Sequence, residues 1–340
     1  MKSPGFWRRG GAGLPRVLLT PFGMVWQTLG ALKQSLSKPE DVAVPVVCIG
    51  NITVGGTGKT PTVMLVADWF RSHGVTPGVL SRGYRGTLSG NEPVLVDPGR
   101  HKSTEVGDEA LLHARHAPTV IARNRPAGAR LLAGMCDVIL MDDGHQNQTL
   151  VKDLSLIVTD AAEGFGNGAI IPAGPLRESI ARGLGRANAV IAIGDGMLDD
   201  RITRSGLPVL RGRFQPSTES RALSGAPVIG FSGIGRPEKF RETLEQIGAD
   251  IRGFSDFADH HTFTRRELDR IFTEAAAEQA IPVTTAKDAA RLAPEDLARV
   301  SVVEIELVLD QPDQLDRILE PILDRITKRA SGAAPPSRSE

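Results

Sequence analysis

The stretch with the clearest chemical meaning is the glycine-rich segment GNITVGGTGKTPT at residues 50–62. An apolar run at residues 46–49 precedes it, and a segment with helical character follows at residues 62–70. Backbone N–H groups of such a loop can surround phosphate oxygens, and the helix N-terminus adds a favourable dipole. Lys59 would then reach the terminal phosphates, and the Thr60 hydroxyl would hold a magnesium ion. We therefore predict a nucleotide-binding P-loop made of Thr53, Val54, Gly55, Gly56, Thr57, Gly58, Lys59 and Thr60.

The loop departs from the usual P-loop pattern at Thr53, because glycine is expected five residues before Gly58. The alternative interpretation is an ordinary glycine-rich turn between a strand and a helix. The nucleotide interpretation is favoured because the Gly-Lys-Thr end is intact and because the flanking strand and helix fall where phosphate binding needs them.

Carboxylates are candidates for the remaining chemistry of a phosphotransferase, which needs a metal ion and a base near the acceptor hydroxyl. The apolar run at residues 138–141 ends in Asp142 and Asp143, as a Walker B strand does, and either carboxylate could organise Mg²⁺. Asp108 opens a predicted helix at residues 110–116 and is the best placed base on topology. The alternative for Asp108 is a helix-start acid with no chemistry, since carboxylates are electrostatically favoured there.

The elements that must position these groups alternate as strand and helix through residues 41–207. This pattern predicts an α/β fold, a P-loop NTPase-type parallel sheet with helices on both faces. An extended linker is expected at residues 208–224 and a smaller C-terminal α/β domain at residues 225–330, ending in a strand at 300–307 and a helix at 315–328. The tail at residues 331–340 is low in complexity and is expected to be disordered.

The N-terminal residues 1–40 combine basic and apolar character. Arg8, Arg9 and Arg16 precede an uncharged run at residues 17–32, which proline and glycine interrupt and which is shorter than the ~20 residues of a spanning helix. The basic flank and the aromatic residues favour a helix lying in a membrane interface. The alternative is a helix packed on the first domain.

The overall composition is that of an ordinary soluble globular chain of 340 residues, 41% hydrophobic. Lys+Arg and Asp+Glu both number 40, so no global charge attracts nucleic acid, and none is expected as a partner. The two cysteines show no metal-binding spacing and suit a reducing compartment.

The motifs together resemble the lipid A 4′-kinase (tetraacyldisaccharide 4′-kinase) family over roughly residues 10 to 325. That family carries threonine at the position of Thr53. Further matching motifs occur in the same order along the chain: Ser81-Arg82-Gly83-Tyr84, Val106-Gly107-Asp108-Glu109, Asp142-Asp143-Gly144, Pro172-Ala173-Gly174-Pro175-Leu176-Arg177-Glu178, Gly233-Ile234-Gly235 with Pro237, Asp259-His260 and Lys287-Asp288.

The resemblance implies an ATP-dependent kinase that transfers the γ-phosphate to the 4′-hydroxyl of a tetraacylated glucosamine disaccharide 1-phosphate. This glycolipid is an intermediate of lipid A biosynthesis, and the enzyme would be peripheral on the cytoplasmic face of the bacterial inner membrane. Asp108 would be the general base, paired with His260, with His261 as the alternative. Lys59 and Thr60 would keep their P-loop roles toward ATP and Mg²⁺.

The acceptor site implied by the resemblance involves cations and one amide. Arg82 and Arg177 lie inside matching motifs and are the preferred contacts for the lipid 1-phosphate, ahead of Arg123 and Arg125. Asn147 stands where the family has histidine, so it can still form a hydrogen bond but carries no charge.

Three other functions compete with this one. A GTPase-like switch would carry an Asn-Lys-x-Asp motif, which does not occur in this sequence. A non-catalytic nucleotide-binding adaptor would not need Asp108 and His260. A kinase of the same fold could also act on another glycolipid or on a soluble sugar.

Overall fold

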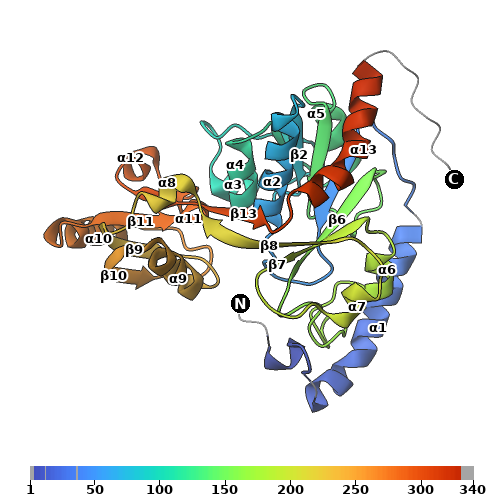
Figure 1. Ribbon diagram of the computed structural model, residues 1–340, viewed down its shortest axis with the longest axis horizontal. Coiled ribbons are helices and arrows are strands. Elements are labelled where there is room, and N and C mark those ends of the chain that lie inside the picture. The colour runs from blue at the N-terminus through green and yellow to red at the C-terminus, as the bar shows by residue number, and fades with distance from the viewer. Residues whose placement is uncertain (1–3, 12, 36, 331–340) are drawn as a thin grey trace.

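The computed structural model describes residues 4–11, 13–35 and 37–330, and the predicted tail at 331–340 lies outside them. Within these residues the chain builds two sheets (Figure 1). The larger sheet has nine strands in the order β13-β8-β7-β6-β1-β5-β2-β4-β3, and the smaller has four in the order β10-β9-β11-β12.

The centre of the large sheet is parallel, since β1 pairs in parallel with both β5 and β6. The outer strands β3 and β13 pair antiparallel with their neighbours. Every residue of the central strands β1, β5 and β7 is buried, as expected for a parallel sheet covered on both faces. The strands are β1 (Val46–Gly50), β2 (Pro77–Ser81), β3 (Val94–Leu95), β4 (Thr119–Ile121), β5 (Val138–Asp142), β6 (Leu154–Asp160), β7 (Ala189–Ile193), β8 (Val209–Pro216) and β13 (Ile305–Leu309).

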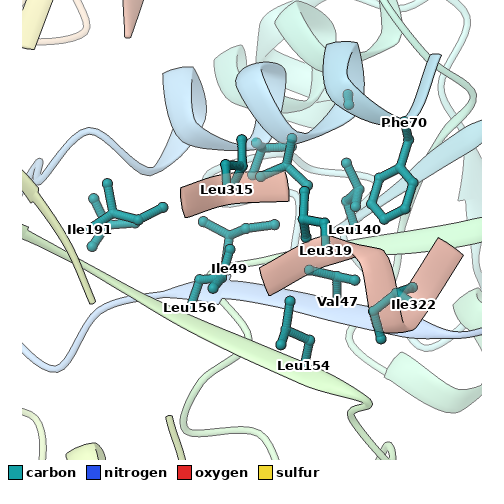
Figure 2. Close-up of a cluster of buried hydrophobic side chains, with 14 of the residues drawn as sticks. Val47, Ile49, Phe70, Leu140, Leu154, Leu156, Ile191, Leu315, Leu319 and Ile322 are labelled. Carbon is teal, nitrogen blue, oxygen red and sulfur yellow. The ribbon is translucent and has the colours of Figure 1, made fainter. Parts of the chain in front are cut away.

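Helices cover both faces of this sheet, as alternate side chains of β1 show. Val47 and Ile49 pack in one core with α2 (Lys59–Ser72) and α13 (Asp313–Ala330). Figure 2 shows Leu315, Leu319 and Ile322 of α13 lying against side chains of β1 and β6. Val46 and Cys48 point to the opposite face and pack with α5 (Arg125–Leu132).

The small sheet is also parallel and is also covered on both faces. Val228 packs with α9 (Pro237–Ile247), whereas Ile229 and Phe231 pack with α10 (Arg265–Ala277). Its strands are β9 (Pro227–Ser232), β10 (Asp250–Asp256), β11 (Ile281–Thr285) and β12 (Ser301–Val303).

The predicted boundary of the second domain is wrong at its C-terminal end. The strand expected at residues 300–307 is two strands, of which β12 joins the small sheet and β13 joins the large one. The predicted linker also contains β8, which pairs with β7 and β13. The second unit is therefore an insertion at residues 217–304 between β8 and β13, while α13 returns to the first core (Figure 1).

The N-terminal segment contains a short 3₁₀ helix, η1 (Gly5–Trp7), and the longer helix α1 (Leu14–Ser35), which passes the carbonyl groups of Ile170 and Ile171 at Gly23. Among the described helices, none is long and apolar enough to cross a membrane. The remaining short helices are α3 (Ser103–Val106), α4 (Asp108–Ala114), α6 (Ile180–Leu184), α7 (Asp200–Thr203), α8 (Thr218–Arg221), α11 (Ala286–Ala289) and α12 (Pro294–Leu297).

Candidate active site

The predicted P-loop connects the end of β1 to the start of α2. Gly58 caps α2 with φ at 91°, a left-handed conformation that favours glycine. A Cβ atom at Gly58 would also lie 2.7 Å from side-chain atoms of Ile193 and Phe214, so a larger residue has no space there. In contrast, Cβ atoms at Gly55 and Gly56 would meet nothing within 4 Å, so this part of the loop is open to a ligand.

The structure explains the threonine at position 53 in physical terms. Thr53 is 7% exposed and forms an antiparallel bridge with Leu176, while the Val54 amide donates to the Pro175 carbonyl at 2.8 Å. Thr53 is not among the residues with positive φ, so its backbone does not require glycine. The loop is therefore attached to the matching motif that contains Pro175 and Leu176.

Asp142 lies at the end of β5 and is 2% exposed. Its Oδ2 accepts a hydrogen bond from His113 Nε2 at 3.2 Å, whereas its Oδ1 is buried and has no hydrogen-bond partner among the described residues. Burial raises the pKa of Asp142, but the His113 hydrogen bond and the nearby charges of Lys59 and Arg125 outweigh burial and lower the pKa. Asp142 is thus an anion with one oxygen available beside the P-loop.

Asp143 has different partners from Asp142, although the two are adjacent. Lys59 Nζ lies 3.7 Å from Asp143 Oδ1, and Arg177 donates to both carboxylate oxygens at 2.9 and 3.0 Å. The backbone of Asp143 has φ at 50°, so the chain turns sharply after β5. The negative charge of Asp143 is therefore already balanced by two cations.

Asp108 and His260 meet across the junction of the two units. Gly107, with φ at 91°, starts the helix that carries Asp108, and His260 has the left-handed φ of 63°. His260 Nδ1 lies 2.8 Å from Asp108 Oδ2. Because an ionised carboxylate only accepts hydrogen bonds, the Nδ1 of this histidine carries the proton.

Arg291 is a third member of this cluster, and the sequence analysis missed it. It donates to Asp108 Oδ2 from Nε at 3.1 Å and from Nη2 at 2.7 Å. Burial raises the pKa of Asp108, but hydrogen bonds from His260 and Arg291 outweigh burial and lower it to about 2. The one feature of the sequence that could have indicated Arg291 is its position one helical turn after the matching Lys287-Asp288 motif.

Three further polar residues, His261, His145 and Asn147, have hydrogen-bond partners within the protein. His261 Nε2 lies 3.0 Å from Glu267 Oε2, so it is not the partner of Asp108. His145 is fully buried and donates from Nε2 to the Gly183 carbonyl at 2.9 Å. The Asn147 side-chain oxygen accepts hydrogen bonds from the backbone and hydroxyl of Thr149, which leaves its amide group for other contacts.

All predicted site residues line a single cavity of about 2250 Å³. The same cavity reaches Trp7 and Trp26 of the N-terminal segment and Arg291 of the inserted unit. The predicted residues on its wall are Thr53, Val54, Gly55, Gly56, Thr57, Gly58, Lys59, Thr60, Arg82, Asp108, Asp142, Asp143, Asn147, Arg177 and His260.

Known proteins resemble this chain over almost its whole length. Residues 15–324 match the model of the family described as tetraacyldisaccharide-1-P 4′-kinase. Proteins named tetraacyldisaccharide 4′-kinase are 46% identical in Rhodospirillum centenum, covering 95% of this chain and 97% of that protein, and 44% identical in Rhodospirillum rubrum, covering 95% and 98%.

A solved structure shares the fold. The crystal structure of the "apo" form of LpxK from Aquifex aeolicus in complex with ATP is 26% identical, with a TM-score of 0.72, and the match covers 91% of this chain and 99% of that one. The predicted α/β kinase fold is thereby confirmed. The chain belongs to the tetraacyldisaccharide-1-P 4′-kinase family.

Proposed function

We propose that this protein is an ATP-dependent kinase that phosphorylates the 4′-hydroxyl of a tetraacylated glucosamine disaccharide 1-phosphate. The observation that carries the proposal is the contact of Asp108 with His260, 2.8 Å apart on the wall of the cavity that also contains the P-loop. A switch protein or an adaptor does not need such a pair. The names of the relatives support the substrate.

In the proposed reaction a bond forms between the 4′-oxygen and the γ-phosphorus of ATP, and the bond from that phosphorus to the β,γ-bridging oxygen breaks. ADP leaves, and the hydroxyl proton passes to Asp108. With a pKa of about 2, Asp108 is ionised throughout the physiological pH range. Since phosphoryl transfer has a loose transition state, orienting the hydroxyl matters more than strong basicity. Lys59 holds the transferring phosphoryl group.

The residues near the P-loop fit a magnesium ion. Mg²⁺ is usually bound by one or two protein oxygens together with phosphates and water, and it neutralises charge that develops on the phosphoryl group. The unpaired Oδ1 of Asp142 and the Thr60 hydroxyl are the groups that would hold it. Of the two candidates, Asp143 is the less suitable because Lys59 and Arg177 already balance its charge.

The acceptor would lie between the P-loop and the N-terminal segment. Arg82 lies exposed on the cavity wall and suits the 1-phosphate, with Asn147 supplying a neutral hydrogen bond. The guanidinium of Arg177 already donates to Asp143. Arg177 would therefore contact the substrate while it keeps this ion pair. The matching motif of Arg177 thus serves the P-loop side of the cavity as well as the acceptor side.

The acyl chains of the glycolipid would lie near the exposed apolar face of α1. Seven large apolar side chains of this helix are between 55% and 70% exposed: Leu14, Val17, Leu18, Phe22, Met24, Val25 and Trp26. An exposed apolar face of this kind favours a membrane interface over solvent. Peripheral attachment through α1 to the cytoplasmic face of the inner membrane would deliver the glycolipid to the cavity.

A transfer assay tests the proposal. The full chain is incubated in detergent micelles with γ-radiolabelled ATP, Mg²⁺ and the tetraacyl disaccharide 1-phosphate. Label should move to the lipid, and an acceptor already phosphorylated at the 4′-position should remain unlabelled. Transfer to a soluble sugar in place of the lipid would contradict the proposed substrate.

A further inference from the structure

Asn167 attaches the N-terminal segment to the large unit. The residue is 8% exposed and lies in the loop between β6 and α6. Its side-chain amide group donates to the Phe6 carbonyl at 2.8 Å and to the Ala173 carbonyl at 3.0 Å, while its side-chain oxygen accepts from the Ala169 amide at 2.9 Å. The Asn167 backbone amide also donates to the Trp7 carbonyl at 2.9 Å. The N-terminal segment is therefore held at two successive carbonyl groups, those of Phe6 and Trp7.

The same loop is also joined to the P-loop. The Pro175 carbonyl accepts a hydrogen bond from the Val54 amide at 2.8 Å. Gly166 lies between the two attachments, since a Cβ atom there would clash with the Trp7 carbonyl oxygen and would lie 2.7 Å from the Pro175 ring. One loop therefore fixes the position of the N-terminal segment relative to the phosphate-binding backbone.

Trp7 is the side chain that this attachment presents to the cavity. The residue is half-buried and lines the cavity that contains the P-loop. Its indole N–H donates to the Pro172 carbonyl at 3.1 Å, and its ring meets the Phe6 ring edge-on, with the ring centroids 6.5 Å apart. The N–H is the single hydrogen-bonding group of an indole. Because the protein already binds that group, the exposed surface of the ring offers apolar contacts to a ligand.

We propose that Trp7 is a substrate-contacting residue whose indole face receives a C–H surface of the acceptor, and that Asn167 is the positioning residue that holds it there. This inference rests on the proposed function. The loop that holds Trp7 also contacts α1, where Gly23 passes the Ile170 carbonyl. The ring thus lies where an acceptor must extend from α1 toward the P-loop. A sugar ring and the first carbons of an acyl chain both offer the C–H surface that a large, rigid aromatic side chain binds.

The first test measures the KM for the acceptor in detergent micelles. Trp7→Ala should raise this KM about tenfold through the loss of one aromatic contact, while the KM for ATP changes little. Trp7→Phe keeps an aromatic ring and should stay within about threefold of the wild type. Asn188→Ala is the control, because the Asn188 side chain also accepts a backbone amide, that of Ser155 at 2.8 Å, but lies outside the described wall of the cavity. An unchanged acceptor KM in Trp7→Ala would overturn the proposal.

A double-mutant cycle separates positioning from general support of the loop. Asn167→Ala should raise the acceptor KM by a factor similar to that of Trp7→Ala, because the indole loses its fixed place. If Asn167 acts through Trp7, the double variant should bind the acceptor no more weakly than Trp7→Ala alone. Effects that multiply in the double variant, or an equal rise in the KM for ATP, would overturn the positioning role of Asn167.

Fluorescence tests the contact without turnover. The chain contains three tryptophans, so Trp26→Phe combined with Trp69→Phe leaves Trp7 as the reporter. In the absence of ATP, micelles that carry the acceptor should shift the Trp7 emission to shorter wavelength, because water leaves the ring. Micelles with the same amount of phosphatidylglycerol should not cause this shift. A variant that keeps only Trp69, whose indole donates to Asp316 on α13, should not respond to the acceptor.

Acceptors with the same disaccharide but shortened acyl chains identify the surface that Trp7 contacts. An effect of Trp7→Ala that persists with short chains assigns the contact to the sugar ring, and one that disappears assigns it to an acyl chain; either result supports the proposal. If the wild type transfers no phosphate, the proposed function fails while the emission still tests the contact. In an active kinase, a Trp7 emission that ignores the acceptor, or that shifts equally with phosphatidylglycerol, overturns the proposal.

Discussion

Asp108 receives more hydrogen-bond donors than a simple proton acceptor needs. His260 and Arg291 both donate to its Oδ2, and the side chain is only 11% exposed. An ionised carboxylate fixed in this way can align a hydroxyl group with an incoming phosphoryl group. The contacts place this carboxylate at the junction of the two units and not within the P-loop itself.

Replacing Asp108 should affect turnover much more than nucleotide binding. We expect Asp108→Ala to reduce kcat about 10²- to 10⁴-fold, the usual contribution of a general base. The affinity for ATP, measured by calorimetry, should remain close to the wild-type value because the P-loop is untouched. Near-normal turnover in this variant would exclude Asp108 as the base.

The same carboxylate should make stability depend on pH in acid. The pKa of Asp108 is lowered from 3.8 to about 2 in the folded chain, so its stabilising effect is present above pH 3.8 and is lost as the pH falls through about 2. Since one pKa unit corresponds to ~1.4 kcal/mol, the full effect is about 2.5 kcal/mol. Urea unfolding of the wild type and of Asp108→Asn at several pH values measures it.

The difference in unfolding free energy between these two proteins should stay constant above about pH 4 and shrink below it. Asp200→Asn, at a position with a side chain 71% exposed, is the matched control. A difference that is constant down to pH 2 would contradict the ion pair between Asp108 and Arg291.

His113 should contribute to stability through Asp142. It is 1% exposed and supplies the side-chain hydrogen bond to a carboxylate that is itself 2% exposed. His113→Leu leaves that buried carboxylate without a donor, which typically costs about 1–3 kcal/mol. Chemical denaturation should show this loss, and His116→Leu, on the exposed end of the same segment, should stay within about 0.5 kcal/mol of the wild type.

At the scale of elements, α1 combines a fixed position with an exposed apolar face. Gly23 is buried where α1 passes the carbonyl groups of Ile170 and Ile171, and η1 is held by hydrogen bonds from Asn167 to Phe6 and from Trp7 to Pro172. The helix is therefore attached to the large unit on one side while its apolar side chains remain outside.

A charge on this face should weaken membrane binding. Phe22 is 65% exposed, and burying a phenylalanine side chain contributes about 1.5–3 kcal/mol. Phe22→Glu should therefore reduce the partition into anionic phospholipid vesicles at least about tenfold, as measured by flotation. Leu95→Glu, at a 44% exposed position on β3, is the control and should not alter binding.

Most elements could be predicted from the sequence, because apolar runs and glycine turns are local signals. The strand before the P-loop, the P-loop helix and the strand ending in Asp142 were each expected and are present as β1, α2 and β5. The strand β10 was not predicted, since Asp250–Asp256 is largely polar and half-exposed. The predicted site residues all reach one cavity because the carboxyl ends of parallel strands share an edge.

At the scale of the whole molecule, sequence patterns could not show which sheet a strand joins. The residues 300–307 look like one strand, yet the chain passes from the small sheet to the large sheet at Glu304. Arg291 and His113 were missed for a similar reason: their partners lie 183 and 29 residues away, and no local motif marks such pairs. The pairing of Asp108 with His260, which are 152 residues apart, was expected only because the resemblance implied it.

The helix α13 follows the inserted unit in the sequence but packs in the core of the large sheet. A change in α13 should therefore lower the stability of the large unit and not that of the inserted unit. Leu319 is fully buried in the core of the large sheet, so Leu319→Ala should cost about 2–5 kcal/mol there. Hydrogen exchange should speed up in β1 and β6 and remain slow in β9. Leu268→Ala, in the core of the inserted unit, should show the reverse pattern, and accelerated exchange of β9 in Leu319→Ala would contradict the assignment of α13.

The antiparallel pairing of Pro216 with Ile305 means that the inserted unit is tethered to the large sheet by two neighbouring strands. The Ser217 amide also donates to the Glu304 carbonyl at 3.0 Å, so the two connections are joined where they leave the sheet. A tether of this kind holds His260 near Asp108 at an effective concentration on the order of millimolar or above. Assembly of the cluster is therefore intramolecular, and its extent should be independent of the concentration of the protein.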